Sequence, residues 1–304
     1  MIRINQIKLD IGTDEKILNS KIQKLLRLKN SSFTYTIVKK SIDARKKEHI
    51  MYIYSVDVKV DGIDETALVR KLNNKDIIIN KNIKYVFPQI KDTHKNKKIA
   101  IIGSGPAGLF CGLLLARAGF KPVIYERGGN VHERTGIVNA FFETGILDTE
   151  TNIQFGEGGA GTFSDGKLNS VIKEKDGRIR KVLETFVEFG ASPEILYVNK
   201  PHVGTDVLSV VVSNIRNEII RLGGTVNFNS KVTDIYIDTG KITGIRVNDE
   251  YDEEFNAVVL APGHSARDTF EMLLKKGVEM EKKSFAVGMR IEHNQSLINN
   301  FAYG

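Results

Sequence analysis

Ile99-Ala-Ile-Ile-Gly-Ser-Gly-Pro-Ala-Gly-Leu-Phe110 is the stretch of this sequence that decides its fold. Its first four residues are all apolar, without the alternation of a half-exposed strand, and such a run predicts a strand in a parallel sheet covered on both faces. Residues 109–118 have helical spacing, and residues 122–125 form a second apolar strand. The order strand, glycine turn, helix, strand predicts a β-α-β unit.

Three glycines stand in this turn at the spacing of a dinucleotide-binding loop. Gly103 permits the tight turn, Gly105 lets a pyrophosphate approach the backbone, and Gly108 lets the helix pack closely on the strand. Pro106 suits the first helical turn, because its missing N–H is not needed there. Glu126 ends the second strand, where a carboxylate can accept hydrogen bonds from ribose hydroxyls. The stretch therefore predicts a dinucleotide site, and the glycines alone leave open which dinucleotide it takes.

A second match to the same glycine spacing occurs at residues 156–161. Residues 151–155 are a poor strand, and the Thr-Phe-Ser-Asp-Gly that follows does not readily open a helix. This segment is therefore expected to be a glycine loop that passes near the same ligand and adds backbone donors to it. It does not predict a second dinucleotide-binding domain.

Residues 1–90 have a different pattern and are expected to form a small α+β domain. The expected strands are residues 2–9, 32–38, 51–60 and 83–87, and the expected helices are residues 14–28 and 64–72. The order β-α-β-β-α-β is that of a ferredoxin-like module. Pro88 and the polar run at residues 91–98 predict a linker.

The remaining sequence completes an α/β domain over residues 99–263. A helix is expected at residues 206–222, a strand at 225–228, and a β-meander at 232–237, 242–247 and 254–260. Together these elements predict a three-layer, Rossmann-like α/β domain. Residues 264–304 read as the start of a substrate or cap domain, with elements at 270–276 and 285–292. We expect the 304 residues to be the N-terminal part of a longer protein.

The composition, 41% hydrophobic and 27% charged, is ordinary for a globular protein. The sequence shows neither a signal-peptide pattern nor the ~20 apolar residues of a membrane span. Its single cysteine, Cys111, is expected to be a packing residue, and cytoplasm is the expected location. Residues 1–98 carry 22 Lys and Arg against 11 Asp and Glu, but the lysines are scattered. Because they are scattered, solvated lysines are the preferred interpretation, and a nucleic-acid surface is the alternative.

Several longer segments carry a resemblance to a known family. They are Ser41-Ile-Asp-Ala-Arg-Lys46, Gly103-Ser-Gly-Pro-Ala-Gly108, Glu126-Arg-Gly128, residues 155–168, Lys200-Pro-His-Val-Gly-Thr-Asp206, residues 260–268 and Gly288-Met-Arg-Ile-Glu-His293. Through them the chain resembles the NAD(FAD)-utilising, or FAD-dependent, dehydrogenases of the glutathione-reductase-type FAD superfamily. The resemblance implies FAD as the cofactor, with NAD(P)H as an electron donor. It departs at Pro262, where the superfamily often has threonine.

The resemblance also implies the residues that contact FAD. They are Gly103, Ser104, Gly105, Pro106, Ala107, Gly108, Glu126, Arg127, Gly158, Gly159, Gly161, Thr162, Val232, Ala261 and Gly263. Gly103, Gly105 and Gly108 with Glu126 and Arg127 would hold the ADP half, and Gly263 would lie along the dinucleotide. Residues 158–162 would approach the pyrophosphate or the flavin, and Val232 would lie beside the adenine.

No residue pattern identifies a catalytic group, but three candidates follow glycine turns. Lys167 could stabilise an anionic reduced flavin, and His264 and Arg267 could face a substrate; structural or solvated roles are the alternatives. The histidines have no partners at metal-ligand spacing, so no metal site is predicted. One cysteine also provides no redox pair of the disulfide-reductase kind.

The function expected from these observations is FAD-dependent oxidoreduction of an unidentified small molecule, with hydride transfer at flavin N5. One alternative is a protein whose flavin is structural and whose basic N-terminal module docks RNA or a protein partner. A domain that binds only NAD is a third hypothesis.

Overall fold

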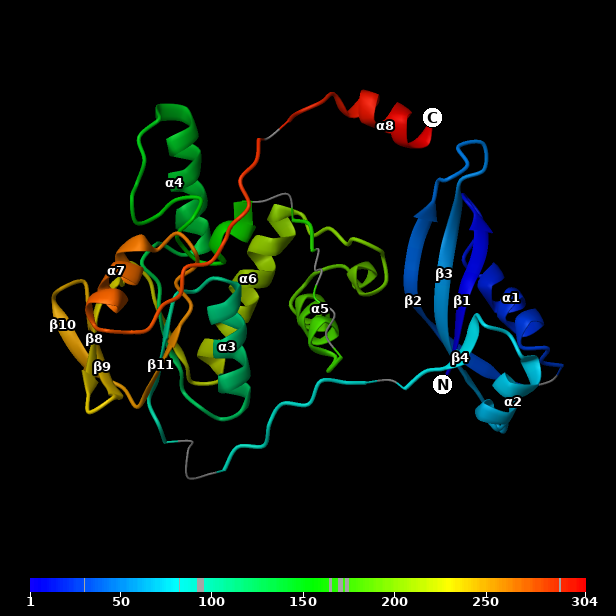
Figure 1. Cartoon of the computed structure of the whole chain (residues 1–304), viewed down its shortest axis with the longest axis horizontal. Helices are drawn as coiled ribbons and strands as arrows, with labels where there is room; N and C mark the ends of the chain where they lie inside the picture. Colours follow the sequence, from blue (N-terminus) through cyan, green and yellow to red (C-terminus); the bar gives the residue numbers. More distant parts are fainter. Residues whose placement is uncertain are drawn as a thin grey trace.

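The structure, a computed structural model, describes residues 1–29, 31–81, 83–91, 96–163, 166–168, 172, 175–289 and 291–304. It contains an N-terminal module and a larger α/β domain, joined by a long segment whose described residues form neither helix nor strand (Figure 1). Residues 92–95 of the predicted linker lie outside the described residues.

The N-terminal module is a four-stranded antiparallel sheet of order β2-β3-β1-β4 with two helices. Its elements are β1 (Ile2–Asp10), α1 (Ile17–Leu25), β2 (Phe33–Asp43), β3 (Met51–Val60), α2 (Glu65–Leu72) and β4 (Ile77–Ile79). A register shift between Ile4 and Ile7 turns both side chains into the core, although their odd spacing would otherwise place them on opposite faces. The predicted order of elements is observed, and the assignment to the ferredoxin-like class stays a prediction.

The last strand of this module differs from the prediction. It is β4, in which Ile77 is buried and pairs with Ile4, whereas residues 83–87 contain no described strand. The three isoleucines of β4 follow α2 after a short turn. An apolar run of three residues gives a weaker strand signal than the longer run at residues 83–87. Residues 83–87 instead pass beside Gly177 of the α/β domain.

The α/β domain has three layers around a parallel sheet of order β11-β5-β6-β7. Its strands are β5 (Ile99–Ile102), β6 (Val123–Tyr125), β7 (Thr225–Asn227) and β11 (Ala257–Leu260). One face packs on α3 (Pro106–Arg117) and α6 (Thr205–Arg221), and the other on the β-meander and α7 (Arg267–Lys275) (Figure 1). Accordingly Ile101 joins the helical core, while Ala100 and Ile102 join the meander core. Burial on both sides explains why this strand does not alternate.

The third strand predicted for the meander, residues 254–260, is divided between two strands of the structure. The meander consists of β8 (Val232–Asp238), β9 (Lys241–Val247) and β10 (Tyr251–Glu254), and β11 then pairs with β5 in the parallel sheet. The chain changes sheets at Asn256, whose N–H donates to the Lys98 carbonyl and whose Oδ1 accepts from the Lys98 N–H at 2.9 Å. Sequence periodicity does not reveal this bend, because both strands are short.

Further helices complete the described chain. These are α4 (Val131–Thr144), α5 (Arg178–Glu188) and α8 (Gln295–Tyr303), with short 3-10 helices η2 (Gly159–Phe163) and η3 (Pro193–Leu196). Residues 285–289 and 291–292, for which an element was predicted, contain neither helix nor strand. α4 was not predicted, although Asn130 and Glu133 form a capping box at its start and are a readable signal.

Candidate dinucleotide-binding site

The first glycine loop links β5 to α3 as the sequence predicts. Gly103 has a φ of 99°, and a Cβ there would overlap the carbonyl oxygen of Ala261. A Cβ at Gly108 would overlap the carbonyl oxygen of Gly103. Both positions therefore need glycine because of the protein's own packing.

Gly105 differs, because no described residue requires a glycine at this position. Its backbone has φ −67° and ψ −177°, which any residue can adopt, and a Cβ would come no closer than 3.9 Å to another atom. Gly105 is the N-cap of α3, so the N–H groups of the first helical turn have no acceptors within the helix. A glycine that leaves these donors accessible fits a ligand with phosphates at this helix end.

Glu126 is buried, with 5% of its surface exposed, and ties the two glycine loops together. Its Oε2 accepts from the N–H of Ser104 at 2.7 Å and from the Ser104 hydroxyl at 2.9 Å. Its Oε1 accepts from the N–H groups of Gly128 at 3.1 Å and Gly156 at 3.0 Å. A carboxylate has about four acceptor positions, so a ribose hydroxyl must replace one of these protein donors to bind Glu126.

The second glycine loop packs against the first. The N–H of Gly158 donates to the Ser104 carbonyl at 2.9 Å, and a Cβ at Gly159 would lie 3.3 Å from the Cα of Gly105. The loop continues into the 3-10 helix η2 and does not open an α-helix after a strand. It is thus part of the first site and not a second dinucleotide-binding unit.

A charged cluster adjoins the Glu126 end of the loops. Arg127 donates to Asp268 at 2.8 Å, Lys231 lies 2.7 Å from Asp268, and the Arg127 guanidinium lies 4.3 Å from the Phe155 ring centre. Burial opposes ionisation of Asp268, but the hydrogen bonds from Arg127 and Lys231 outweigh it and hold the pKa of Asp268 well below its usual range. Asp268 begins α7, so this cluster fixes α7 beside the site.

The two glycine loops and the turn after β11 enclose a cavity of about 200 Å³. Its lining residues are Gly103, Gly105, Pro106, Ala107, Glu126, Gln154, Phe155, Gly156, Gly159, Ala160, Ala261, Pro262, Gly263, His264 and Ser265. A second hollow of about 30 Å³ lies between Glu126, Arg127 and Val232. Gly103, Glu126, Phe155 and Pro262 line both hollows, which are therefore adjacent. Ligand pockets usually measure ~300–1,000 Å³, so each hollow is smaller than the usual pocket for a whole ligand.

The remaining predicted residues lie around this cavity in different ways. Five of them do not line the cavity. Four of these five are buried, namely Ser104, Gly108, Gly158 and Thr162, and the fifth is Gly161. Among the catalytic candidates only His264 lines it. Lys167 pairs with His202 in an isolated bridge, and Arg267 is exposed at the start of α7.

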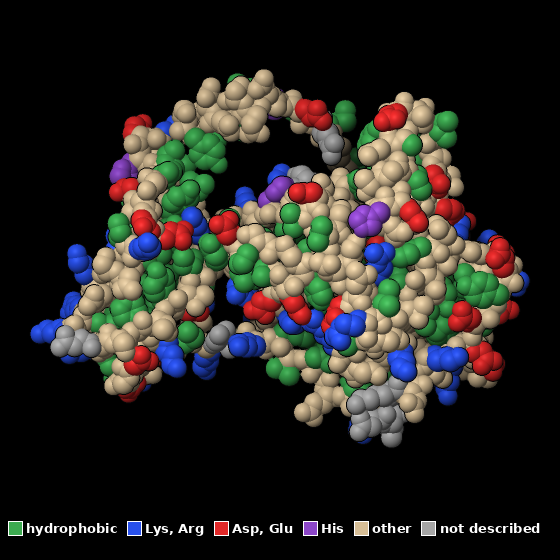
Figure 2. Space-filling model, turned by 180° about the vertical axis from the view of Figure 1, so that it is seen from behind, with side chains coloured by type: hydrophobic (Ala, Val, Ile, Leu, Met, Phe, Trp, Pro, Cys, Tyr) green, Lys and Arg blue, Asp and Glu red, His purple; other side chains and the backbone are tan. Residues whose placement is uncertain are grey.

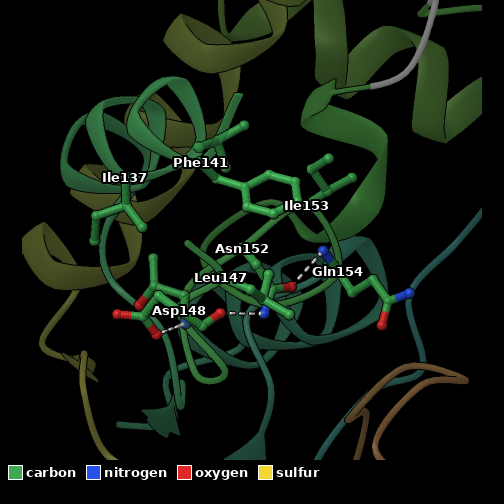
Figure 3. Close-up of a pocket in the computed structure, with 9 residues that line it drawn as sticks. Ile137, Phe141, Leu147, Asp148, Asn152, Ile153 and Gln154 are labelled. Atoms are coloured by element: carbon green, nitrogen blue, oxygen red, sulfur yellow. Dashed lines mark hydrogen bonds between the residues drawn. The ribbon is translucent and has the colours of Figure 1, made fainter. Parts of the chain in front are cut away.

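A separate apolar hollow of about 210 Å³ lies between α4 and the loop before Gly156 (Figure 3). Ile137, Phe141, Leu147 and Ile153 point into it, and Asn152 closes the loop by donating to the Asp148 carbonyl at 2.8 Å. Its lining is mostly apolar, and Gln154 lines both this hollow and the cavity beside the α3 end. The described residues include no helix long and apolar enough to cross a membrane.

The most important residue that the sequence did not single out is Arg134 of α4. Its side chain is fully buried and donates to several carbonyl groups of the second glycine loop. Glu157 is also fully buried, accepts from the Val131 N–H at 2.8 Å and lies 3.3 Å from Arg216. Burial raises the pKa of Glu157. In the sequence, only the capping box of α4 indicates this part of the site.

These features define a dinucleotide-binding α/β protein with one phosphate loop at the helix end. Residues 97–298 match the family described as pyridine nucleotide-disulphide oxidoreductase, and the chain belongs to this family. Residues 1–59 match a domain of unknown function. FAD is the cofactor that the family implies, and Gly105, the α3 end and Glu126 fit its ADP half.

A Clostridium beijerinckii protein described as "Uncharacterized protein" is 47% identical over 305 residues, covering 100% of this chain. The chain spans 56% of that relative's length. Among solved structures, THI4 of Thermovibrio ammonificans matches with 20% identity and a TM-score of 0.38, over 62% of this chain and 65% of that one. A thioredoxin reductase from Gloeobacter violaceus matches with 16% identity and a TM-score of 0.30, over 55% and 36%.

Proposed function

We propose that this chain is the FAD-binding part of an oxidoreductase that passes a hydride between flavin and a small molecule. The observation that carries the proposal is Gly105, whose missing side chain has no explanation in the protein's own packing but fits a pyrophosphate at the α3 end. When bound, the flavin supplies the redox chemistry, and the protein supplies binding and orientation.

The described residues have defined tasks in this proposal. The first-turn N–H groups of α3 hold the pyrophosphate, and the Glu126 carboxylate accepts from a ribose hydroxyl after giving up one protein donor. Val232 and Phe155 offer apolar surface to the adenine. His264, at the cavity edge after β11, is the candidate that could reach a substrate or the flavin.

Chemistry through a cysteine pair is not part of the proposal, although the family description names disulphides. These 304 residues contain one cysteine, and Cys111 lies on α3 in the helical core. Burial raises the pKa of its thiol, which keeps it protonated and unreactive at neutral pH. The electron donor that we propose is NAD(P)H, and the location that we propose is the cytoplasm.

A titration of the purified chain tests the proposal. FAD and ADP should both bind saturably, NADP⁺ should bind more weakly because its 2′-phosphate would meet Glu126, and NADH or NADPH should bleach the flavin absorption anaerobically. Saturable binding of NAD⁺ without binding of FAD would replace the proposal by an NAD-binding domain. FAD binding without reduction by either donor would favour a different electron source or a structural flavin.

The charge of residues 1–98 supports a second candidate, in which the N-terminal module docks RNA or a protein. Its basic side chains are spread among acidic and hydrophobic ones on the face seen in Figure 2, where this module lies on the left. A dispersed distribution favours solvated lysines. A filter-binding assay with mixed RNA at physiological salt tests it, and retention that survives added salt would favour docking over non-specific attraction.

A further inference from the structure

The sheet of the N-terminal module has two different faces. The helices α1 and α2 pack on one face through the apolar core of the module. On the other face, Thr36 of β2 pairs with Asp57 of β3, and Asp57 pairs with Arg3 of β1, so these side chains form a row across three strands. Lys39 and Ser55 are a further pair on this face. These residues alternate with the core residues along each strand and form a polar face without a covering helix of the module.

The polar face is one wall of a hollow of about 830 Å³ at the junction with the α/β domain. The start of α5 and the segment after β4 form the other walls (Figure 1). Lys40 donates its N–H to the Tyr197 carbonyl at 2.7 Å and accepts from the Asn199 N–H at 2.8 Å, which joins β2 to the α/β domain. A Cβ at Gly177 would lie 2.9 Å from the Tyr85 nitrogen, so these segments also touch. The junction hollow has the size of a ligand pocket, usually ~300–1,000 Å³, and ligand pockets often lie between domains.

Basic side chains dominate the lining of the junction hollow. They are Arg3, Lys39, Lys81, Lys84, Arg180 and Lys181. Both acidic residues of the lining are already paired. Asp57 accepts from Nε and Nη2 of Arg3, each at 2.8 Å, and Glu184 accepts from Nε of Arg180 at 2.9 Å. The ammonium groups of the four lysines have no acceptor among the described residues. The hollow therefore offers uncompensated positive charge to a ligand.

The Arg3 guanidinium is held in a fixed position on the polar face. Asp57 is buried, with 6% of its surface exposed, and it also accepts from Nδ2 of Asn80 at 3.0 Å. Nη1 of Arg3 has no acceptor within the part of the chain that the structure describes. A planar guanidinium that is already ordered loses little side-chain freedom when it binds an anion.

The chemistry of the lining favours a small phosphate-bearing ligand over RNA. Four-stranded sheets that bind single-stranded RNA stack its bases on aromatic side chains. Among the described residues of β1 to β4, none that lines the hollow is aromatic. Lysine and arginine are the usual partners of phosphate groups. Ile83, Ile179, Leu183 and Leu196 also line the hollow and offer apolar surface to the organic part of such a ligand.

We propose that the junction hollow binds a small organic phosphate between the N-terminal module and the α/β domain. The hollow shares no lining residue with the cavity beside the α3 end, so the proposal does not depend on a flavin. The ligand contacts lysines of both β2 and α5. Its binding should therefore hold the two parts of the chain together and raise the Tm.

Calorimetric titration of the full chain with inorganic pyrophosphate and with fructose 1,6-bisphosphate, at physiological salt, tests the proposal. The double variant Lys39→Gln/Lys181→Gln removes one ammonium group from each side of the hollow and should bind both probes about tenfold or more weakly. The control Lys24→Gln/Lys71→Gln removes the same charge from exposed positions of α1 and α2. Salt screens distant charges, so the control should bind both probes within about twofold of the parent chain.

The comparison of the two double variants decides the outcome. Equal affinity of the parent chain and the Lys39→Gln/Lys181→Gln variant would overturn the proposal, as would the absence of saturable binding of both probes. Equal loss in the two double variants would show general charge attraction only. Pyrophosphate binding that Gly105→Ala abolishes and Lys39→Gln/Lys181→Gln does not affect would place the anion at the α3 end instead. A mixed RNA that binds more tightly than both probes, and loses affinity in Lys39→Gln/Lys181→Gln, would replace the small ligand by RNA.

Discussion

The Gly105→Ala substitution separates ligand binding from folding at the first glycine loop. The new methyl group has room in the protein, 3.9 Å from the Cα of Gly159, and the backbone angles suit alanine. Replacing glycine by alanine at a compatible position restricts the unfolded chain and raises stability by about 0.4–1 kcal/mol. The variant should therefore melt at the same temperature as the parent chain or slightly higher.

The same methyl group lies where the pyrophosphate must approach the α3 end. Each charge-assisted hydrogen bond contributes about 1.5–3 kcal/mol, so moving the phosphates out of reach of two N–H groups should cost at least about 3 kcal/mol, or more than ~100-fold in affinity. Calorimetric titration with ADP and FAD measures this loss. An affinity within about twofold of the parent chain, in a variant that folds, would refute the assignment of Gly105.

Two other glycines provide controls for this measurement. Gly136 lies on the exposed side of α4 with no atom near its missing Cβ, so Gly136→Ala should stabilise the helix by about 0.5–1 kcal/mol and leave ADP binding unchanged. Gly108→Ala would overlap the Gly103 carbonyl oxygen and should prevent folding. Only Gly105→Ala should therefore lose the ligand and keep the fold.

Three further outcomes follow from the structure. Glu126→Gln deprives at least one of four protein donors of its acceptor, so the Tm should fall even without ligand. The control Glu143→Gln, at an exposed position of α4, should leave the Tm unchanged. Equal Tm values of the two variants would show that the Glu126 carboxylate does not link the two loops. Asp268 has a lowered pKa in the folded state, so its contribution is present above the ordinary carboxyl pKa of about 3.9 and is lost as pH falls. Asp268→Asn should accordingly lower the Tm at pH 7, with a difference that shrinks under acid; a constant difference from pH 7 to pH 3 would contradict this. Cys111, with its raised pKa, should react with a thiol reagent at pH 7 much more slowly than free cysteine, and fast labelling of the native chain would show that α3 opens.

The first glycine loop could be predicted because each glycine acts locally. The strand, the turn and the helix start follow one another within twelve residues, and Glu126 is marked by the end of the next apolar strand. The sequence also predicts that the second loop passes near the same ligand, but not which residues hold this loop in place. The second loop is bound by Arg134, whose partners lie 18 to 25 positions away and are backbone carbonyls, which no side-chain pattern marks.

The misplaced strands have a common physical origin. β4 and β11 are only three and four residues long, and their pairing partners, Ile4 and Ile99, lie far away in the sequence. Short apolar runs have no clear periodicity, so tertiary pairing decides whether they become strands. Residues 83–87 show the opposite case, in which a strand-like local pattern forms no strand.

The pairing of β11 with β5 has a consequence for how the protein is made. Gly103, which lines the cavity, lies so close to the Ala261 carbonyl oxygen that a Cβ would overlap it. β11 pairs with β5, the first strand of the domain in the sequence. During synthesis, the phosphate loop emerges long before the strand and turn that complete it. Contacts so distant in sequence form late and slowly. The nascent chain therefore passes through a stage in which β5 has an open edge, and the dinucleotide can be captured firmly only after residues 257–265 have left the ribosome.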